Sequence, residues 1–263
     1  MTDKILHEYF DINRWTKAID KGVLKDIRKD QLIRLTDEHT RLAIADAMLK
    51  GKYEISPPHT AQIPKENGEF RTVYVNEPID RVLLSIANDL LFDLMPKMLH
   101  KSCKSYQTGI GCGRVVKEVS YQITNAHNGD CLGWKSDLSK YFDSVPLQYI
   151  DEMFDKVEVK HGHSVLIDVL RKYYHCDLYF DEDNNLKSKF QSLKQGCAVA
   201  SWLADVLLYN LDEELSQMNG YYVRYSDDML FIGEDYEKAM SVLQQRLGEM
   251  SMTLNPKKVE YLT

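Results

Sequence analysis

The order of the predicted elements indicates an α+β fold in which an antiparallel sheet carries helices on one face. From about residue 130 onward, the sequence reads as strand, helices, hairpin, helix, strand–turn–strand and helix. The 263 residues, 44% of them hydrophobic, suffice for one large domain or two small ones. No apolar run reaches the roughly 18 residues that a membrane-spanning helix needs. We therefore expect a folded protein without a membrane segment.

Helices and a hairpin are predicted in the N-terminal part. Apolar residues recur at three- and four-residue spacing over 14–29 and 36–51, and Thr36 is a candidate cap for the second helix. The pair Asn67-Gly68 lies between two β-prone arms and predicts a hairpin. Pro78 opens a further helix. The apolar stripe of this helix consists of Ile79, Val82, Leu83, Ile86, Leu90 and Leu94.

The rest of the chain supplies the α+β pattern. Asp235 is a candidate cap for the last predicted helix, and "TLNPKKVEYL" closes the chain. The predicted elements are a helix over 113–129, a strand over 130–138, helices near 147–157 and 163–174, a hairpin over 177–193, a long helix over 198–218, two strands joined by a turn over 221–233, and a helix over 235–250.

Charge and cysteine content restrict the function classes. The net charge of −7 and the pI of about 5.6 weigh against nucleic-acid binding, although an acidic body can carry a local basic groove. The five cysteines form no CxxC pair, as expected of reduced thiols. The acidic N-terminus lacks the apolar segment of a secretory signal, so we expect a cytoplasmic protein. His161 and His163 could suggest a metal site, but an exposed turn is the favoured interpretation.

Asp227 and Asp228 stand in "YYVRYSDDMLFIG", an otherwise β-prone and largely apolar run. Adjacent strand residues point to opposite faces, so the two acids can share a site only near a turn, which "YSDD" provides. Asp137 follows another short strand of the same predicted sheet. Three clustered carboxylates raise one another's pKa unless cations bind, and Mg²⁺ favours such oxygen ligands together with phosphate. The alternative is that these acids lie on exposed turns.

Six segments, in order, resemble the motifs of bacterial reverse transcriptases. "YSDD" resembles their catalytic hairpin, and "DLSKYFDSV" (137–145) resembles their first catalytic motif. "LKQGCAVAS" (193–201) resembles their Gln-Gly motif, and "LNPKK" (254–258) resembles the motif after the hairpin. "IPKENGEFRTVYVNEPIDR" (63–81) is similar to their fingers hairpin, and "SYQTGIGCGR" (105–114) to their Ser-Tyr-Gly-Phe-Arg-x-Gly-Arg-Ser element. Many relatives continue the Gln-Gly motif with Ser-Pro, whereas "CAVAS" follows here, which leaves the intron, retron or phage-defence subfamily open.

The resemblance, which covers roughly residues 60–263, implies the fingers and palm of a right-hand polymerase, with an antiparallel palm sheet and helices on one face. It places an N-terminal helical fingers extension at 1–60, the fingers at 61–130 and the palm at 131–263, with fingers elements partly interleaved. Family members usually continue into a helical thumb, whereas this chain stops soon after "LNPKK". We therefore expect the thumb to be missing, as in a fragment, a minimal form or a protein whose partner supplies it.

The resemblance also implies roles for single residues. Asp137, Asp227 and Asp228 would be catalytic and would bind two Mg²⁺ ions, with Mn²⁺ as a substitute. Phe142 would lie under the sugar and exclude a 2′-hydroxyl, whereas related RNA polymerases place an aspartate at that spacing, so Phe142 favours dNTPs. Asp143 would face the other way on an extended segment. Core packing is the alternative role for Phe142.

Cationic and polar residues would hold the nucleotide. Lys65 and Arg71 flank the predicted turn and would clamp the triphosphate. A two-residue turn puts them on opposite faces of the hairpin and a three-residue loop puts them on the same face. The alternative is a solvated charged hairpin. Gln195 would donate to the sugar or triphosphate, and Gly196 would permit close approach of the backbone to nucleotide and template.

The remaining assignments concern pyrophosphate, template and primer. Lys257 or Lys258 could act as a general acid toward pyrophosphate or form a solvated pair, and Lys257 is assigned here to nucleotide binding. Arg81 and Arg114 would contact the template backbone. Tyr225 would pack beneath the primer end, with core packing as its alternative.

The expected function is that of an RNA-directed DNA polymerase, a nucleotidyltransferase that uses an RNA template, a DNA or RNA primer and dNTPs. The setting would be phage defence or a mobile retroelement, and a homo-oligomer or a thumb-bearing partner would be compatible with it. Two alternatives stay open. One is template-independent nucleotide addition. The other is a polymerase-like scaffold that binds nucleotide or a partner without extension, which the missing thumb and low charge favour and the complete carboxylates oppose.

Overall fold

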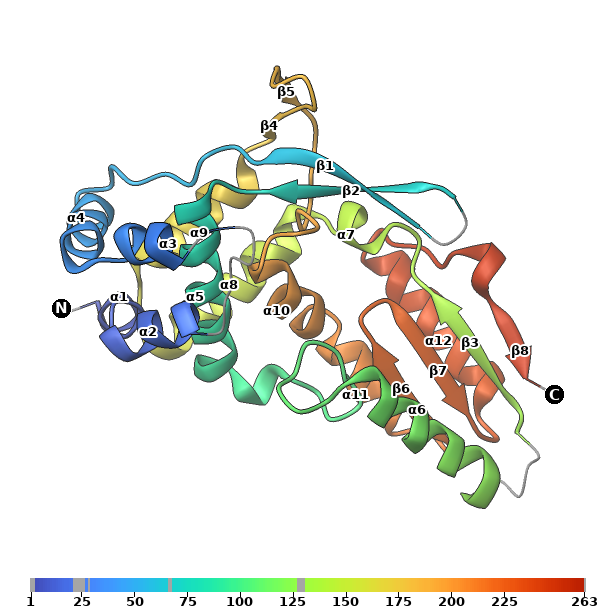
Figure 1. Cartoon of the computed structure of the whole chain (residues 1–263). Coiled ribbons are helices and arrows are strands. Elements are labelled where there is room, and N and C mark those ends of the chain that lie inside the picture. Colours follow the sequence, from blue (N-terminus) through green and yellow to red (C-terminus); the bar gives the residue numbers. More distant parts are fainter. Residues whose placement is uncertain (1–2, 21–26, 28, 66–67, 127–130, 263) are drawn as a thin grey trace. The chain divides into compact units, whose positions relative to one another are not determined.

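The computed structural model describes residues 3–20, 27, 29–65, 68–126 and 131–262 (Figure 1). The chain forms two compact units. Unit 1 comprises Met1–Met95 and Leu147–Trp202, and unit 2 comprises Pro96–Pro146 and Leu203–Thr263. Residues 147–202, which the sequence places with the palm, cluster with the N-terminal residues in unit 1. The predicted α+β class, with antiparallel strands and helices, is confirmed.

Helices make up most of unit 1. Pro78 opens α5 as predicted, and the buried face of this helix includes Val82, Leu83, Ile86 and Leu90. The N-terminal helices dock on it, because the buried hydroxyl of Tyr9 donates to the carbonyl oxygen of Leu83 at 2.9 Å. The helices are α1 (Lys4–Tyr9), α2 (Ile12–Asp20), α3 (Lys29–Leu35), α4 (Glu38–Leu49), α5 (Pro78–Leu94), α8 (Leu147–His161) and α9 (Val165–His175).

Two details of the N-terminal helices differ from expectation. In the described part of the helix predicted over 14–29, α2 covers Ile12–Asp20 and Ile27 is not helical, and residues 21–26 and 28 lie outside the described residues. Asp37, not Thr36, caps α4, because its carboxylate accepts from the backbone N–H of Thr40 at 2.7 Å. The Thr36 hydroxyl instead donates to the carbonyl oxygen of Leu32 in the preceding helix.

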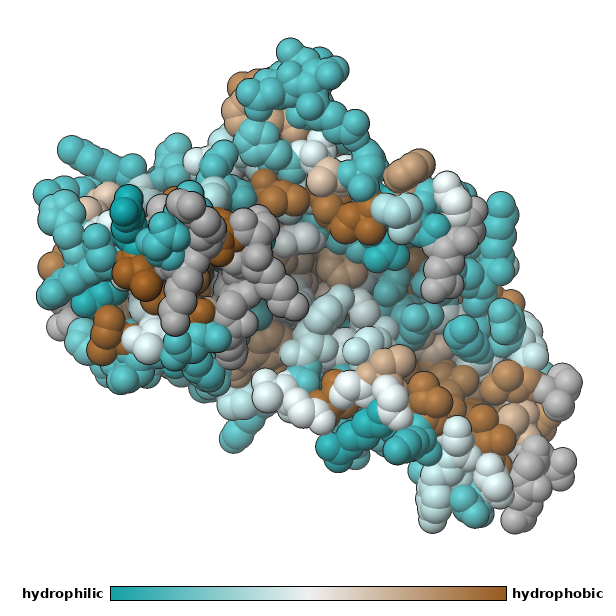
Figure 2. All heavy atoms as spheres, in the orientation of Figure 1, coloured by the Kyte–Doolittle hydropathy of each residue, from teal (hydrophilic) through white to brown (hydrophobic). Residues whose placement is uncertain are grey.

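The unit 1 sheet joins two hairpins that are predicted separately. Its strands are β1 (His59–Pro64), β2 (Phe70–Val75), β4 (Leu178–Phe180) and β5 (Leu186–Ser188), in the order β2-β1-β4-β5. Both hairpins are antiparallel as predicted, whereas β1 and β4 pair in parallel at His59 and Phe180. Hydrophilic residues predominate over the β4–β5 arm in Figure 2, which agrees with its Asp- and Asn-rich turn.

The unit 2 sheet is wholly antiparallel. Its strands are β3 (Gly133–Asp137), β6 (Tyr221–Tyr225), β7 (Asp228–Ile232) and β8 (Glu260–Leu262), in the order β6-β7-β3-β8. One face is buried, because Trp134 stacks on Phe231 and its indole N–H donates to the Tyr236 carbonyl oxygen at the start of α12 (Tyr236–Glu249). Side chains of a strand point alternately to the two faces of the sheet, so Asp137, three positions after Trp134, lies on the opposite face.

Helices of unit 2 confirm the predicted pattern with two corrections. The prediction of one continuous helix over 198–218 is wrong, because α10 (Val199–Val206) ends and a separate helix, α11 (Tyr209–Ser216), follows. The guanidinium of Arg224 takes the carbonyl oxygens of Ala204 and Asp205, which would accept the next intrahelical bonds. Asp235 precedes α12 but accepts from the backbone N–H of Asn219 instead of capping the helix.

Unit 2 contains further helical segments before and between its strands. They are η1 (Pro96–Met98), α6 (Cys112–Tyr121), the π-helical turn η2 (Gln122–Ala126), α7 (Tyr141–Ser144), α11 (Tyr209–Ser216) and η3 (Pro256–Lys258). The division between the units falls within α10. Among the described residues, no helix has both the length and the apolar character needed to cross a membrane.

Candidate active site

The turn between β6 and β7 places Asp227 at the end of the unit 2 sheet. Tyr225 pairs with Asp228, so Ser226 and Asp227 form a two-residue hairpin turn. Ser226 has a φ of 58°, the positive value that a type II′ turn requires at its first central position. A positive φ is uncommon for a residue other than glycine and is typical of functional sites. Ser226, the residue with the strained backbone, thus comes immediately before Asp227 in the turn.

Strand register brings Asp137 to the same end of the sheet. Asp137 and Asp228 are direct cross-strand partners, and the backbone N–H of Leu138 donates to the Asp227 carbonyl oxygen at 3.3 Å. Direct partners project from the same face of a sheet. Asp137 is buried, Asp227 is half-buried and Asp228 is exposed. The three predicted acids therefore gather in unit 2, and the exposed-turn alternative does not describe Asp137.

The electrostatics of this cluster match a cation site. Burial raises the pKa of the Asp227 carboxyl, and the nearby Asp137 and Asp228 raise it further. The ammonium of Lys258 lies 2.9 Å from Asp137 Oδ1, and this hydrogen bond raises the pKa of Lys258. A lysine thus supplies one compensating charge to three acids. The donor set, carboxylate oxygens in excess over cations, fits the oxygen-rich coordination that Mg²⁺ and Mn²⁺ prefer.

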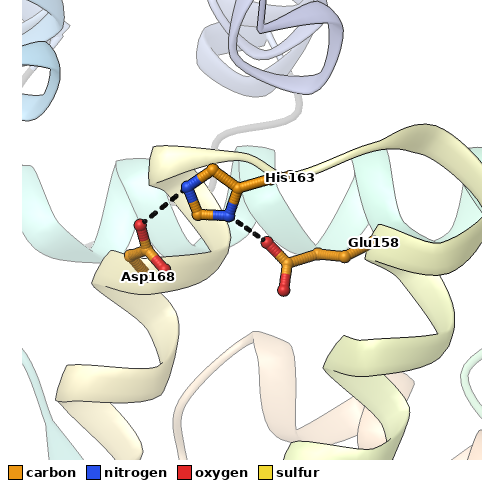
Figure 3. A group of neighbouring side chains, drawn as sticks. All are labelled: Glu158, His163 and Asp168. Carbon is orange, nitrogen blue, oxygen red and sulfur yellow. Dashed lines mark hydrogen bonds and ion pairs between the residues drawn. The ribbon is translucent and has the colours of Figure 1, made fainter.

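A second group of possible metal ligands lies closer together than the predicted catalytic acids. Among the described residues, Glu158, His163 and Asp168 have ligand atoms within 4.8 Å of one another (Figure 3). The ligand atoms of Asp137, Asp227 and Asp228 are not all within that distance in the described structure. The two ring nitrogens of His163 face different carboxylates, at 2.8 Å from Glu158 and 3.4 Å from Asp168. Arg171 also lies 3.1 Å from Glu158. This is an ion-pair cluster between α8 and α9. The exposed turn expected at His161 and His163 is confirmed for His163, whereas His161 is the half-buried last residue of α8.

Phe142 is half-buried on α7, which follows the Asp137 strand. Its neighbour Tyr141 is the residue that anchors the segment, because the buried Tyr141 hydroxyl donates to the Ala204 carbonyl oxygen at 2.9 Å. The ring of Phe142 meets Tyr141 edge to face, with centroids 5.6 Å apart. The segment is a helical turn, not the extended segment on which Asp143 was expected to face away. Phe142 is therefore not a fully buried core residue.

The "LNPKK" motif is tied to the end of β3. Asn255 donates its backbone N–H to the Asp137 carbonyl oxygen at 2.8 Å, and Leu138 bridges to Leu254. This attachment brings the ammonium of Lys258 to Asp137. The side chain of Lys257 is exposed, and the backbone N–H of Lys257 donates to the side-chain oxygen of Asn255. Sequence reasoning could not choose between the two lysines, because their placement depends on how η3 starts.

In unit 1 the structure decides the open question of the fingers hairpin. Pro64 pairs with Phe70, and the backbone N–H of Lys65 donates to the Glu69 carbonyl oxygen at 2.7 Å, which is the register of a hairpin with three residues between its last paired residues. Gly68 has a φ of 81°, as such loops require. Asn67 lies outside the described residues. In this register Lys65 and Arg71 project from the same face of the hairpin, as a shared triphosphate clamp would require.

Gln195 and Gly196 pack against β2 within unit 1. The backbone N–H of Tyr74 donates to the Gln195 carbonyl oxygen at 2.7 Å. Gly196 has a φ of 109°, and a Cβ there would lie 2.7 Å from the Tyr74 carbonyl oxygen. The glycine is therefore needed for a close approach to a strand of its own unit. The Gln195 side chain is half-buried.

The residues predicted to contact template and primer occupy both units. Arg81 lies half-buried on α5 in unit 1, and Arg114 is exposed on α6 in unit 2. Tyr225 is half-buried, directly across from Asp228 and on the same face as Asp137. Within unit 2 the structure thus gathers the acids with Tyr225. Unit 1 contains the predicted site residues Lys65, Arg71, Arg81, Gln195 and Gly196.

Sequence reasoning missed one residue beside the acids. Arg224 is fully buried and donates to the Ser226 carbonyl oxygen at 3.1 Å. A signal was present, because Arg224 interrupts the apolar alternation of "YYVRY" at a position that faces the core.

Comparison with known proteins gives a family match over most of the chain. The family model described as "Reverse transcriptase (RNA-dependent DNA polymerase)" matches residues 63–263. The chain is 24% identical over 229 residues to the retron Ec48 reverse transcriptase of Escherichia coli, covering 83% of this chain and 51% of that protein. It is 21% identical over 172 residues to the putative COX1/OXI3 intron 1 protein of Saccharomyces cerevisiae, covering 65% of this chain and 20% of that protein.

Solved structures show the same fold. A telomerase from Candida albicans, in complex with a fragment of telomeric RNA, matches with a TM-score of 0.54 and 13% identity over 86% of this chain and 46% of that chain. A partial Cas6-RT-Cas1–Cas2 complex matches with a TM-score of 0.52 and 17% identity over 93% of this chain and 41% of that chain. The chain spans about half the length of the retron relative, 51%.

Proposed function

Because the chain belongs to the reverse transcriptase family, we propose that it is an RNA-directed DNA polymerase that extends a primer with dNTPs. The observation that carries this proposal is the gathering of Asp137, Asp227 and Asp228 at one end of the unit 2 sheet. In the reaction, the primer 3′-oxygen forms a bond to the α-phosphorus while the bond from that phosphorus to pyrophosphate breaks. The proton of the 3′-hydroxyl leaves, and pyrophosphate departs.

Asp137, Asp227 and Asp228 would hold two Mg²⁺ ions, for which Mn²⁺ could substitute. When bound, these ions would activate the 3′-hydroxyl and stabilise the leaving pyrophosphate. Lys258, whose ammonium lies 2.9 Å from Asp137 Oδ1, would supply a positive charge beside the acids before the ions bind. Lys258 or Lys257 would then protonate or neutralise pyrophosphate. Neither lysine could do so from a buried position, and both are exposed.

The other residues would bind and select the nucleotide. Lys65 and Arg71, on one face of their hairpin, would clamp the triphosphate, and Gln195 and Gly196 would contact the nucleotide. The half-buried ring of Phe142 would leave no room for a 2′-hydroxyl. Tyr225, next to Asp228 across the turn, would support the primer end, and Arg81 and Arg114 would contact the template backbone. Similarity to a retron protein and an intron protein supports a setting in a retroelement, and phage defence is the other setting that we propose.

Primer extension on an RNA template in Mg²⁺ tests this function. Wild-type protein should incorporate dNTPs in preference to NTPs, and only when template is present. Asp227→Ala should abolish incorporation, whereas Asp46→Ala, an exposed acid of α4 paired with Lys50, should not change it. Incorporation without template would instead support template-independent addition. Nucleotide binding without any extension at low salt would support the scaffold alternative.

A further inference from the structure

Arg224 is a charged side chain enclosed in the core of unit 2. Its exposure is 0%, as is that of Asp212, with which it forms a bidentate pair. The Arg224 Nε lies 2.8 Å from Asp212 Oδ1, and Nη2 lies 2.6 Å from Oδ2. The Tyr222 hydroxyl donates to Asp212 Oδ1 as well, at 2.9 Å. A buried pair of this kind is weak evidence for stability, because hydrophobic replacements often stabilise as well or better.

The remaining N–H groups of Arg224 reach three backbone carbonyls. Nη1 donates to the carbonyl oxygens of Ala204 and Ser226, both at 3.1 Å, and Nη2 donates to that of Asp205 at 2.8 Å. Together with the two bonds to Asp212, all five guanidinium donors have partners. One side chain thus joins the break between α10 and α11 to the turn that carries Asp227.

We propose that Arg224 is a positioning residue that fixes Asp227 for metal binding by holding the carbonyl of Ser226; this rests on the polymerase function proposed above. Ser226 is strained at a φ of 58°, so its conformation needs support from its surroundings. The bond from Arg224 supports the turn from the core, and the bond between Tyr106 Oη and Ser226 Oγ, 3.2 Å, supports it from the surface. The support acts one peptide before Asp227.

Lysine cannot replace arginine in this role. Its ammonium carries three donors on one atom, whereas the partners of Arg224 lie around a planar group with separate nitrogens. Arg224→Lys can therefore keep the charge pair with Asp212 while losing the bond to Ser226. Arg246→Lys is the matched control, because Arg246 also pairs through two nitrogens with one carboxylate, Glu214, but lies on α12 and has no bond to the turn.

The first test measures Mn²⁺ binding to the full chain by the electron paramagnetic resonance signal of free Mn²⁺, alongside primer extension. Arg224→Lys should weaken Mn²⁺ binding and lower kcat by about 10- to 100-fold, as loss of a residue supporting metal ligands does, with little change in the KM for dNTP. Arg246→Lys should change neither. Adding Ser226→Gly should restore Mn²⁺ binding to the Arg224→Lys protein, because glycine adopts a positive φ without support.

A second variant separates positioning from folding. The triple substitution Arg224→Met, Asp212→Leu and Tyr222→Phe replaces the polar group with apolar side chains and should retain the fold, as judged by circular dichroism and thermal unfolding. It should still bind Mn²⁺ about 10- to 100-fold more weakly. A folded triple variant or Arg224→Lys variant with wild-type Mn²⁺ affinity would overturn the proposal, and so would failure of Ser226→Gly to restore binding. If these Mn²⁺ results appear as expected but wild-type protein extends no primer, the positioning role stands and the polymerase function fails.

Discussion

At the scale of single residues, Asp227 occupies a position that disfavours its charge. Burial raises its pKa, and Asp137 and Asp228 add repulsion that Lys258 offsets only in part. A side chain selected for stability alone would be uncharged at this turn. An aspartate at this position is thus explained by the ions that it would bind. Without those ions, its charge should lower the free energy of unfolding by a measurable amount.

Asp227→Asn should stabilise the metal-free protein at pH 7 while abolishing extension. The pKa of Asp227 is higher in the folded state than in the unfolded state. The wild-type protein therefore loses stability as pH rises from the unfolded-state pKa to the folded-state pKa, and the uncharged Asn avoids this loss. The gain in melting temperature should be full above the folded-state pKa and should disappear as pH falls toward the ordinary range of an aspartate. Thermal unfolding at several pH values measures this. A variant that melts below wild type at pH 7 without metal would contradict it.

Asp205 is a second acid whose charge is disfavoured. It is fully buried, burial raises its pKa to about 6, and its Oδ1 accepts from Ser105 and Cys103. Since the folded-state pKa exceeds the unfolded one, stability is lost as pH rises from about 4 to 6. The contribution is at most about 3 kcal/mol, from roughly two pKa units.

Asp205→Asn should remove this pH dependence. Relative to the variant, the wild-type free energy of unfolding should fall between about pH 4 and pH 6, and the difference should level off above about pH 6. Urea unfolding at each pH gives both values. Parallel pH profiles of the two proteins would show that Asp205 is ionised alike in the folded and unfolded states.

At the scale of elements, the loop after residue 193 depends on a glycine at a contact point. Gly196→Ala should lower the free energy of unfolding by about 1–3 kcal/mol or more, since the new Cβ would overlap the Tyr74 carbonyl oxygen at a φ that alanine avoids. Gly248→Ala, in α12 with open space around it, should instead stabilise by up to about 1 kcal/mol. Chemical denaturation compares the two. Equal effects would mean that the contact with β2 does not constrain Gly196.

Local patterns predicted most elements because their causes are local. Pro78 opens α5, and the turn of "YSDD" separates β6 from β7, as the sequence indicates. The break between α10 and α11 has no local signal, because its cause is Arg224, which comes later in the chain. The cap predicted for α12 was also decided by a distant residue, because the Asp235 carboxylate accepts from the backbone N–H of Asn219 instead of capping the helix.

The candidate site was predictable in its acids and less so in its cations. Asp137, Asp227 and Asp228 are marked by motifs, and the sheet register brings them together. Lys258 and Arg224 act through contacts that only the folded chain defines. The fingers hairpin was open between two loop lengths because a shift of one residue changes the face of every side chain.

At the scale of the whole molecule, the charge balance limits nucleic-acid affinity. With a net charge of −7, the chain should bind primer–template weakly, in the range of about 10⁻⁴ to 10⁻⁶ M at physiological salt that is typical of non-specific binding. Fluorescence anisotropy at increasing salt should give a shallow slope, since few phosphates are neutralised. Replacing Arg114 with Gln should reduce that slope by about one. Nanomolar affinity with a steep slope would show that a concentrated basic groove outweighs the acidic surface.

The attachment of Asn255 and Lys258 to the end of β3 also bears on how the protein is made. β6 and β7 are neighbours in sequence and can form a hairpin early, whereas β3 must wait for partners on either side that follow it by roughly a hundred residues. During synthesis, Asp137 leaves the ribosome long before the residues that neutralise it. The nascent chain therefore cannot assemble its cluster of acids until β7 has been synthesised, and the pairing of β3 with β8 then brings Lys258 to the site.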